Sequence, residues 1–98
     1  MKNAYILKAV RTPGCRAKRG KFINVRPDHL ATVALKGLLD KTGIDPNDIE
    51  DVILGCSFPE AEQGMNVGRM VALNAGLSYK VPGQTVNRFC SSGLQSVS

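Results

Sequence analysis

Short apolar runs alternate along the chain with segments in which apolar residues recur every three or four positions. The runs cover residues 4–10, 51–56 and 84–89, and each has the length of a strand. Pro13 and Gly14 follow the first run and would interrupt a hydrogen-bond ladder. We therefore predict three strands. Because the first run is apolar at consecutive positions, we expect it to be buried on both faces.

The segment after residue 26 has the pattern of an amphipathic helix. Pro27 fixes φ at the first helical position, and Asp28 offers a capping oxygen. The apolar positions then follow helical spacing at Leu30, Val33, Ala34 and Leu38. These features predict a helix from residue 27 to about Lys41, with Gly43 beyond its end.

Further helical structure is predicted nearer the end of the chain. Residues 44–51 favour a turn or a single helical turn, whereas Asn66 is suited to cap a helix that Gly76 terminates. The shared apolar face of that helix consists of Val67, Met70, Val71 and Ala75. A third helix is expected from Ser91 onward, almost directly after the third strand.

The order of these elements defines the expected fold class. We predict an α/β protein with the order β-α-β-α-β-α and a mainly parallel, or mixed, sheet. The 98 residues suffice for one small domain or a piece of one, so residues 1–98 are taken as a single unit without linkers or repeats. In open α/β sheets ligands bind at the carboxyl ends of the strands, and Cys90 falls at such an end.

Composition and cysteine usage indicate the compartment. Three widely spaced cysteines, Cys15, Cys56 and Cys90, fit neither a disulfide framework nor paired metal ligands, so we expect a reducing environment and no metal. The first residues lack the long apolar core of a secretory signal, and no apolar run is long enough to cross a bilayer. Cytoplasmic localisation without a membrane partner is therefore predicted.

The formal net charge of +5 comes largely from residues 11–26. Six basic side chains lie there without an acidic neighbour: Arg11, Arg16, Lys18, Arg19, Lys21 and Arg26. Two interpretations of this basic segment remain: a solvated loop, or a surface that contacts an anionic small molecule or another subunit. Nucleic acid is disfavoured, because Phe22 is the only aromatic residue available for stacking.

Cys90 is the candidate nucleophile. A helix amino terminus supplies free N–H donors and the positive end of a dipole, which favour a thiolate and can hold the oxyanion formed when it attacks a carbonyl. The backbone N–H of Cys90 is itself a candidate donor. Ser91 and Ser92 are suited to cap the turn, and Gly93 permits close approach. From these residues alone, a buried structural thiol remains the alternative.

The segment "VNRFCSSGLQSV" closely resembles the sequence around the acyl-accepting cysteine of the thiolases. The preceding stretch "QGMNVGRMVALNAGLSYKVPGQT" and the early "VRTPG" are also similar to that family. The residue type matches the family pattern at nine positions of this stretch: Gly64, Asn66, Arg69, Ala72, Ala75, Gly76, Leu77, Val81 and Pro82. The motif "NRFCSSG" is most similar to the corresponding motif of 3-ketoacyl-CoA thiolases, and nearly as similar to that of acetoacetyl-CoA thiolases.

The resemblance implies an acyltransferase. Cys90 would attack a 3-ketoacyl-CoA, release acetyl-CoA and pass the acyl group to coenzyme A, or run the reverse condensation. Coenzyme A is then a substrate, and no metal or tightly bound cofactor is implied. Homodimers or homotetramers are implied for the full-length protein. We expect this chain to end within the helix after the nucleophile. The family's two catalytic histidines and second catalytic cysteine belong to its carboxy-terminal half, so we also expect negligible activity of this chain alone.

The remaining candidate residues are expected to be structural. His29, the only histidine, matches no catalytic position of the family, and we expect a solvated or capping role. Cys15 and Cys56 are expected to be packing or incidental. Asn66 is expected to be a helix cap and Arg69 a structural or subunit contact. Met65 and Met70, with the leucines, are expected in the core.

One departure from the family and one alternative function stay open. The sequence "CRAKRGKF" stands where family members commonly carry a glycine-rich turn, so the loop that holds Cys15 is expected to differ in shape or contact. The alternative is a non-catalytic α/β module that binds an anionic partner or another subunit through residues 11–26.

Overall fold

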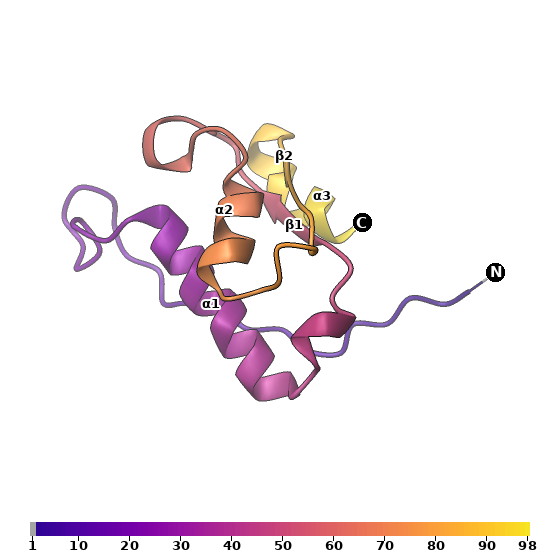
Figure 1. Cartoon of the computed structure of the whole chain (residues 1–98). Coiled ribbons are helices and arrows are strands. Elements are labelled where there is room, and N and C mark those ends of the chain that lie inside the picture. Colours follow the sequence, from indigo (N-terminus) through magenta and orange to yellow (C-terminus); the bar gives the residue numbers. More distant parts are fainter. Residues whose placement is uncertain (1) are drawn as a thin grey trace.

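The computed structural model of the chain describes residues 2–98, which form three α-helices around a small sheet (Figure 1). The elements are α1 (Pro27–Thr42), β1 (Val52–Gly55), α2 (Val67–Asn74), β2 (Gly83–Val86) and α3 (Ser92–Val97). Short 3-10 helices at Pro46–Asp48, Ala61–Gln63 and Phe89–Ser91 lie between them. The predicted α/β class is confirmed, as is the single helical turn after α1.

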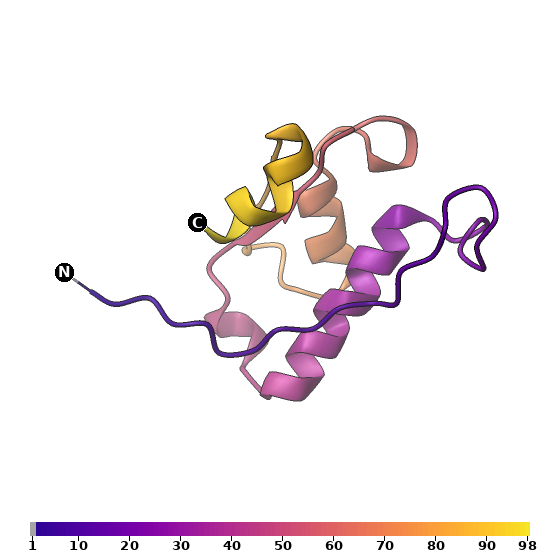
Figure 2. The same cartoon turned by 180° about the vertical axis from the view of Figure 1, so that it is seen from behind.

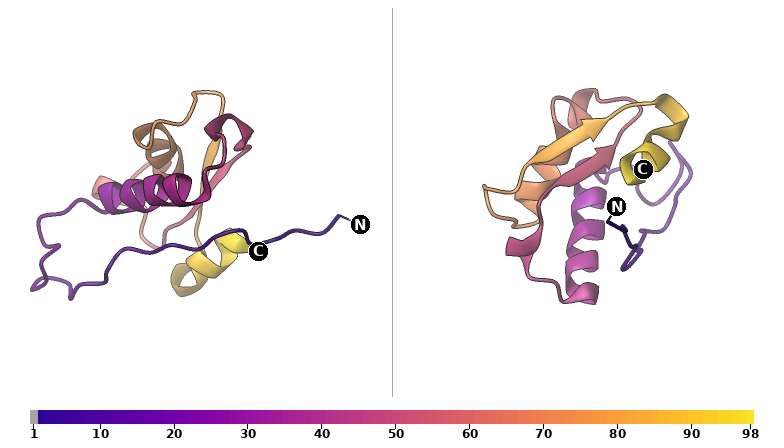
Figure 3. Two further views of the ribbon diagram at one scale, coloured as in Figure 1. Left: turned by 90° about the horizontal axis from the view of Figure 1, so that it is seen from below. Right: turned by 90° about the vertical axis from the view of Figure 1, so that its right-hand side faces the viewer.

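The two strands form a parallel pair with α2 in the connection between them. Val52 lies opposite Gly83 and Gly55 opposite Val86, so both strands end at the same edge of the sheet. One more ladder bond follows, from the Cys56 N–H to the Val86 carbonyl at 3.0 Å. α2 covers one face of the sheet with α1 beside it, and α3 lies on the opposite face (Figure 3).

The Pro27 and Gly43 signals at the ends of α1 are confirmed, whereas the N-cap residue is Arg26 and makes no side-chain capping bond. Pro27 occupies the first turn, and the helix stops where Gly43 adopts a left-handed conformation with φ of 65°. The Gly43 N–H donates to the Leu39 carbonyl at 3.0 Å, which satisfies an otherwise unpaired group of the last turn. The predicted bounds of this helix are confirmed to within one residue at its carboxyl end.

α2 lies directly on the backbone of β2. Asn66 caps the helix by accepting from the Arg69 N–H, as predicted. A Cβ on Gly68 would lie 2.3 Å from the carbonyl oxygen of Gln84, so only glycine permits this approach. The Gly68 N–H instead donates to the Thr85 hydroxyl at 3.0 Å, which ties the helix to the strand.

The core lies between α2, α1 and the sheet. Its buried apolar side chains are Cys56, Val67, Val71, Ala72, Ala75, Leu77 and Val81. Leu35 of α1 packs against both buried clusters, so α1 contributes to the core. Within residues 2–98, no helix is both long enough and apolar enough to cross a membrane.

The prediction of a buried strand at residues 4–10 is wrong. This segment is extended and runs past α1 on the side where α3 lies, without joining the sheet (Figure 2). Tyr5, Ile6 and Leu7 are 77%, 80% and 78% exposed. An apolar pattern favours extended backbone, but a strand also needs a ladder partner, and among residues 2–98 only β1 and β2 pair. The third predicted strand is shorter than expected, because the chain turns after Val86.

The prediction that Met65 and Met70 lie in the core is also wrong. Met65 is 96% exposed and has a φ of 58°, and Met70 is 51% exposed. Met65 lies in the turn directly before α2, next to the helix cap Asn66, and not on the apolar face of the helix. The expectation fails for part of the leucines as well, since Leu73 and Leu94 are 42% and 75% exposed.

Candidate active site

Cys90 lies in a sharp turn between the end of β2 and the start of α3. Its thiol is free and exposed, in the 3-10 helix Phe89–Ser91. Within residues 2–98, the Cys90 side chain is therefore not packed in the core. The turn follows the carboxyl edge of the two parallel strands, which is where ligands bind in open α/β sheets.

The turn holds a strained backbone. Phe89, directly before Cys90, has a φ of 47°, which a bulky aromatic residue rarely adopts. Such a conformation costs on the order of 1–3 kcal/mol and persists only when neighbouring contacts determine it. Here the Phe89 N–H donates to the Asn87 side-chain oxygen at 2.8 Å, and the Ser91 N–H donates to the Arg88 carbonyl at 3.1 Å.

Two serine hydroxyls converge on the Phe89 carbonyl. The Ser57 hydroxyl donates to it at 2.5 Å, and the Ser92 hydroxyl donates to it at 2.6 Å. The Ser92 oxygen also accepts from the Arg88 N–H at 3.0 Å, so one buried side chain closes both sides of the turn. Ser57 is not among the residues that the sequence pattern predicts for the site. The one feature that could have indicated it is its position two residues after the end of β1, because the parallel strand β2 ends at the same edge of the sheet.

The serines beside Cys90 act differently from one another. Ser92 organises the turn as expected, but Ser91 caps no helix N–H and donates its hydroxyl to the Arg88 carbonyl at 3.1 Å. A Cβ on Gly93 would meet nothing within 4 Å, so space is open next to this residue. Within residues 2–98, the Cys90 N–H donates no hydrogen bond to the protein, which leaves it available for a ligand oxygen.

α3 begins in direct contact with the last residue of β1. A Cβ on Gly55 would lie 2.4 Å from the Ser92 carbonyl oxygen, so this packing requires glycine. On the outer side of the turn, the Arg88 guanidinium donates to the Gln95 side chain at 2.8 Å. The Phe89 ring packs edge-on against Phe58, with centroids 6.5 Å apart. These contacts fix the turn relative to both strands.

Asn66 and Arg69 are structural, as expected. The Asn66 amide donates to the Gly83 carbonyl at 2.8 Å, and its oxygen accepts from the Thr85 hydroxyl at 2.9 Å. The Arg69 guanidinium donates to the carbonyls of Val81 and, at 3.0 Å, Tyr79. Both side chains thus bind α2 to the loop and strand that lead to the Cys90 turn.

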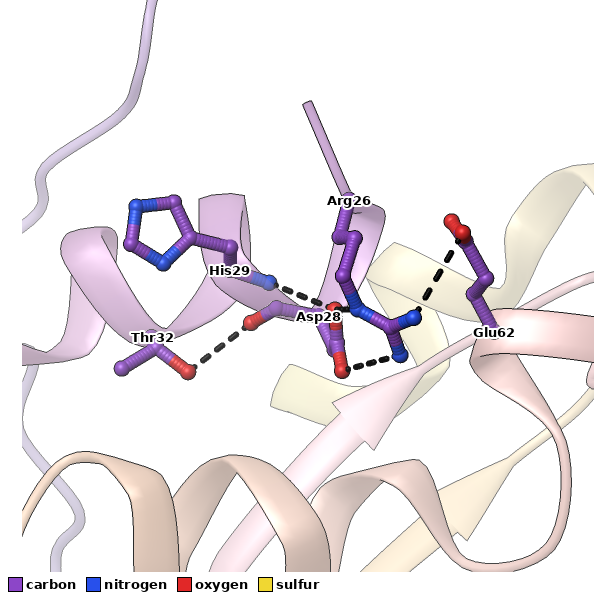
Figure 4. Close-up of polar contacts among 5 residues, drawn as sticks. All are labelled: Arg26, Asp28, His29, Thr32 and Glu62. Carbon is purple, nitrogen blue, oxygen red and sulfur yellow. Dashed lines mark hydrogen bonds and ion pairs between the residues drawn. The ribbon is translucent and has the colours of Figure 1, made fainter. Parts of the chain in front are cut away.

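His29 lies at the exposed first turn of α1, and its ring points away from the neighbouring polar groups (Figure 4). Its backbone N–H donates to Asp28, which also binds Arg26 at 3.0 Å. Arg26 in turn contacts Glu62 at 3.5 Å. The hydrogen bond from Arg26 holds the pKa of Asp28 below its ordinary value, and the same bond raises the pKa of Arg26.

The other two cysteines differ in burial. Cys56 is buried in the core against α2, as expected of a packing residue, whereas Cys15 is exposed in the basic segment. Among residues 2–98, no group of three or more histidine, cysteine, aspartate or glutamate side chains is arranged to hold a metal ion.

Comparison with known proteins gives one consistent family. A family model described as "Thiolase, N-terminal domain" matches residues 4–98. Over 97 residues, the chain is 50% identical to a protein of Bacillus subtilis named 3-ketoacyl-CoA thiolase. It is 44% identical over 98 residues to proteins of the same name from Aliivibrio fischeri and Pseudoalteromonas translucida. These alignments cover 99% of this chain but 25% of the length of each relative.

Proposed function

The chain belongs to the thiolase family through its N-terminal domain, and from this premise we propose that Cys90 is the nucleophile of an acyl transfer. The observation that carries the proposal is the placement of its exposed thiol in a strained turn at the carboxyl edge of a parallel sheet. The free Cys90 N–H supports a second role for the same residue, as a donor to the oxyanion.

The proposed reaction is thiolytic cleavage of a 3-ketoacyl-CoA. The Cys90 thiolate attacks the ketone carbon, and the Cys90 N–H donates to the resulting oxyanion. The bond between the second and third acyl carbons then breaks, and its electron pair leaves with acetyl-CoA, which takes up a proton. The thiol of coenzyme A finally attacks the acyl-cysteine thioester, releases acyl-CoA and returns Cys90. The reverse sequence condenses two acetyl groups.

We propose that residues 1–98 supply the nucleophile part of this site as the amino-terminal portion of a thiolase N-terminal domain. The chain spans 25% of the length of its relatives, and the family's two catalytic histidines and second catalytic cysteine belong to the carboxy-terminal half. His29 offers no substitute for them, because it lies exposed on α1. The chain by itself is therefore expected to have negligible turnover. Coenzyme A is proposed as a substrate, with no tightly bound cofactor, and the full-length protein as a homodimer or homotetramer.

Selective alkylation tests the nucleophile assignment. Iodoacetamide reacts with thiolates, and Cys15 provides an exposed cysteine in the same molecule as an internal reference. The proposal predicts faster modification of Cys90 than of Cys15, measured peptide by peptide by mass spectrometry. Equal, slow modification of the two would contradict it.

The basic segment supports a second candidate function, the binding of an anionic partner. Arg26 is occupied by Asp28 and Glu62, whereas no ion pair is formed by the other five cations within residues 2–98. Those five are exposed: Arg11, Arg16, Lys18, Arg19 and Lys21. Retention on a polyanionic matrix that falls when Arg16, Lys18 and Arg19 become glutamine, while Cys90 alkylation is unchanged, would support this function independently of catalysis.

A further inference from the structure

We infer that Ser57 is a positioning residue for Cys90, an inference that rests on the proposed function. Ser57 lies 32 positions before Phe89 in the sequence, yet its hydroxyl donates to the Phe89 carbonyl at 2.5 Å. That carbonyl and the Cys90 N–H belong to the same peptide group. A contact to the oxygen therefore acts directly on the donor that the proposed reaction uses.

The parallel register explains how Ser57 comes to this place. Gly55 and Val86 are paired at the end of the two strands, and the Cys56 N–H extends the ladder to the Val86 carbonyl at 3.0 Å. Ser57 is the first residue of the β1 side beyond this last bond. Its side chain then meets the turn that follows β2, so the strand pairing itself delivers the hydroxyl.

The contact has two physical consequences for the Cys90 peptide. Together with Ser92, Ser57 holds the plane of the peptide in spite of the strained φ of Phe89. A hydroxyl that donates to an amide oxygen also polarises the amide, which makes its N–H a stronger donor through hydrogen-bond cooperativity. Both effects improve binding of an oxyanion by the Cys90 N–H without any contact between Ser57 and the substrate.

Ser57 and Ser92 both donate to the Phe89 carbonyl, but they differ in their other contacts. Ser92 is buried and also accepts from the Arg88 N–H at 3.0 Å, so its loss would open the turn as a whole. Ser57 is half-buried, and within residues 2–98 its hydroxyl makes a single hydrogen bond, to the Phe89 carbonyl. Replacing Ser57 therefore tests the polarisation and orientation of one peptide with the least disturbance of its surroundings.

The test compares two reactions of Cys90 in the full 98-residue chain. With p-nitrophenyl acetate, the thiolate forms a bond to the ester carbonyl carbon through an oxyanion, and p-nitrophenolate leaves. With iodoacetamide, the thiolate displaces iodide at a saturated carbon, and no oxyanion forms. The ratio of the two rates at Cys90 isolates the oxyanion donor from the reactivity of the thiol itself.

Ser57→Ala is expected to lower the acetylation rate at Cys90 relative to the alkylation rate by up to about fivefold, the limit set by the loss of one whole net hydrogen bond. Ser57→Thr keeps the hydroxyl and is expected to restore most of the ratio. Ser96→Ala is the matched control, since its hydroxyl donates at 2.7 Å to Gly93, a carbonyl outside the Cys90 peptide, and the ratio is expected to be unchanged.

Two results would overturn the inference. Equal loss of both rates in Ser57→Ala would show that Ser57 only maintains the fold of the turn, and an unchanged ratio would show that it has no effect on the donor. Either result leaves the proposed function intact as long as Cys90 of the unaltered chain reacts faster than Cys15. If Cys90 has no such advantage, the proposed function itself fails.

Discussion

A Cβ on Gly55 would lie 2.4 Å from the carbonyl oxygen of Ser92. The last residue of β1 therefore contacts the first residue of α3 backbone to backbone, and the Cys90 turn is held against the sheet by a contact that only glycine allows. This relationship connects the strand pairing, the start of the helix and the position of the proposed nucleophile.

Gly55→Ala is expected to destabilise the chain, because the added methyl group forces α3 away from β1. We expect the free energy of unfolding to fall by about 1–3 kcal/mol, the usual range for overpacking. Gly37→Ala is the control in urea denaturation, since a Cβ there meets nothing within 4 Å in α1 and should stabilise the helix by roughly 0.5–1 kcal/mol. Equal effects of the two substitutions would contradict the proposed contact.

Arg69→Ala is expected to loosen the loop before β2. The guanidinium donates to the Val81 and Tyr79 carbonyls, and removing it leaves both without this partner. A loss of about 1–3 kcal/mol in unfolding free energy is expected, with a smaller loss for Arg69→Lys, whose ammonium lacks the planar fork. Lys36→Ala on the exposed side of α1 should change it by at most about 0.5 kcal/mol. A loss in Arg69→Ala no larger than in Lys36→Ala would argue against the two carbonyl contacts.

The Arg26–Asp28 pair predicts part of the acid sensitivity. The pKa of Asp28 is lowered in the folded chain, chiefly by the hydrogen bond from Arg26. A carboxylate of this kind stabilises the fold above its unfolded pKa of about 3.9, and the contribution is lost as the pH falls through the folded pKa. Stability should therefore decline less steeply below about pH 4 in Asp28→Asn than in the unaltered chain.

Denaturant titrations between about pH 2 and pH 6 measure this difference. Asp40→Asn is the control, because Asp40 is an exposed carboxylate of the same helix without an ion pair among residues 2–98. Identical slopes for Asp28→Asn and the unaltered chain would show that the pair does not contribute.

The apolar residues near the start of the chain predict self-association. Tyr5, Ile6 and Leu7 are consecutive, extended and exposed, a combination that favours pairing with other chains. Ile6→Lys combined with Leu7→Lys is expected to reduce the associated fraction in sedimentation velocity while barely changing unfolding. Tyr79→Ser removes an isolated exposed aromatic residue and should leave association unchanged. If the double variant still associates to the same extent, self-association does not depend on Ile6 and Leu7, and the prediction is wrong.

The sequence predicts those parts of the fold that local chemistry determines. Pro27, Gly43 and Asn66 mark helix ends through backbone rules that need no distant partner, and the structure confirms each of them. Residues 4–10 show the limit of such rules, because an apolar pattern favours an extended segment but does not provide the strand that would pair with it.

The site shows the same division between local and distant information. The position of Cys90 between a strand and a helix follows from the pattern, and its proposed role comes from resemblance to the thiolases. The left-handed backbone of Phe89 and the hydroxyl of Ser57 are invisible locally, since they arise from contacts between residues far apart in the chain. Ser57 becomes predictable only once the register of β1 and β2 is known.

Transfer of an acetyl group from acetyl-CoA tests the central proposal most directly. The chain is incubated with acetyl-CoA, and the acetyl group is located by peptide mass spectrometry, with Cys90→Ser as the control. The proposal predicts a hydroxylamine-sensitive thioester on Cys90 that is absent from the control and present at Cys15 only in traces. Acetylation of Cys15 to the same extent as Cys90 would contradict it.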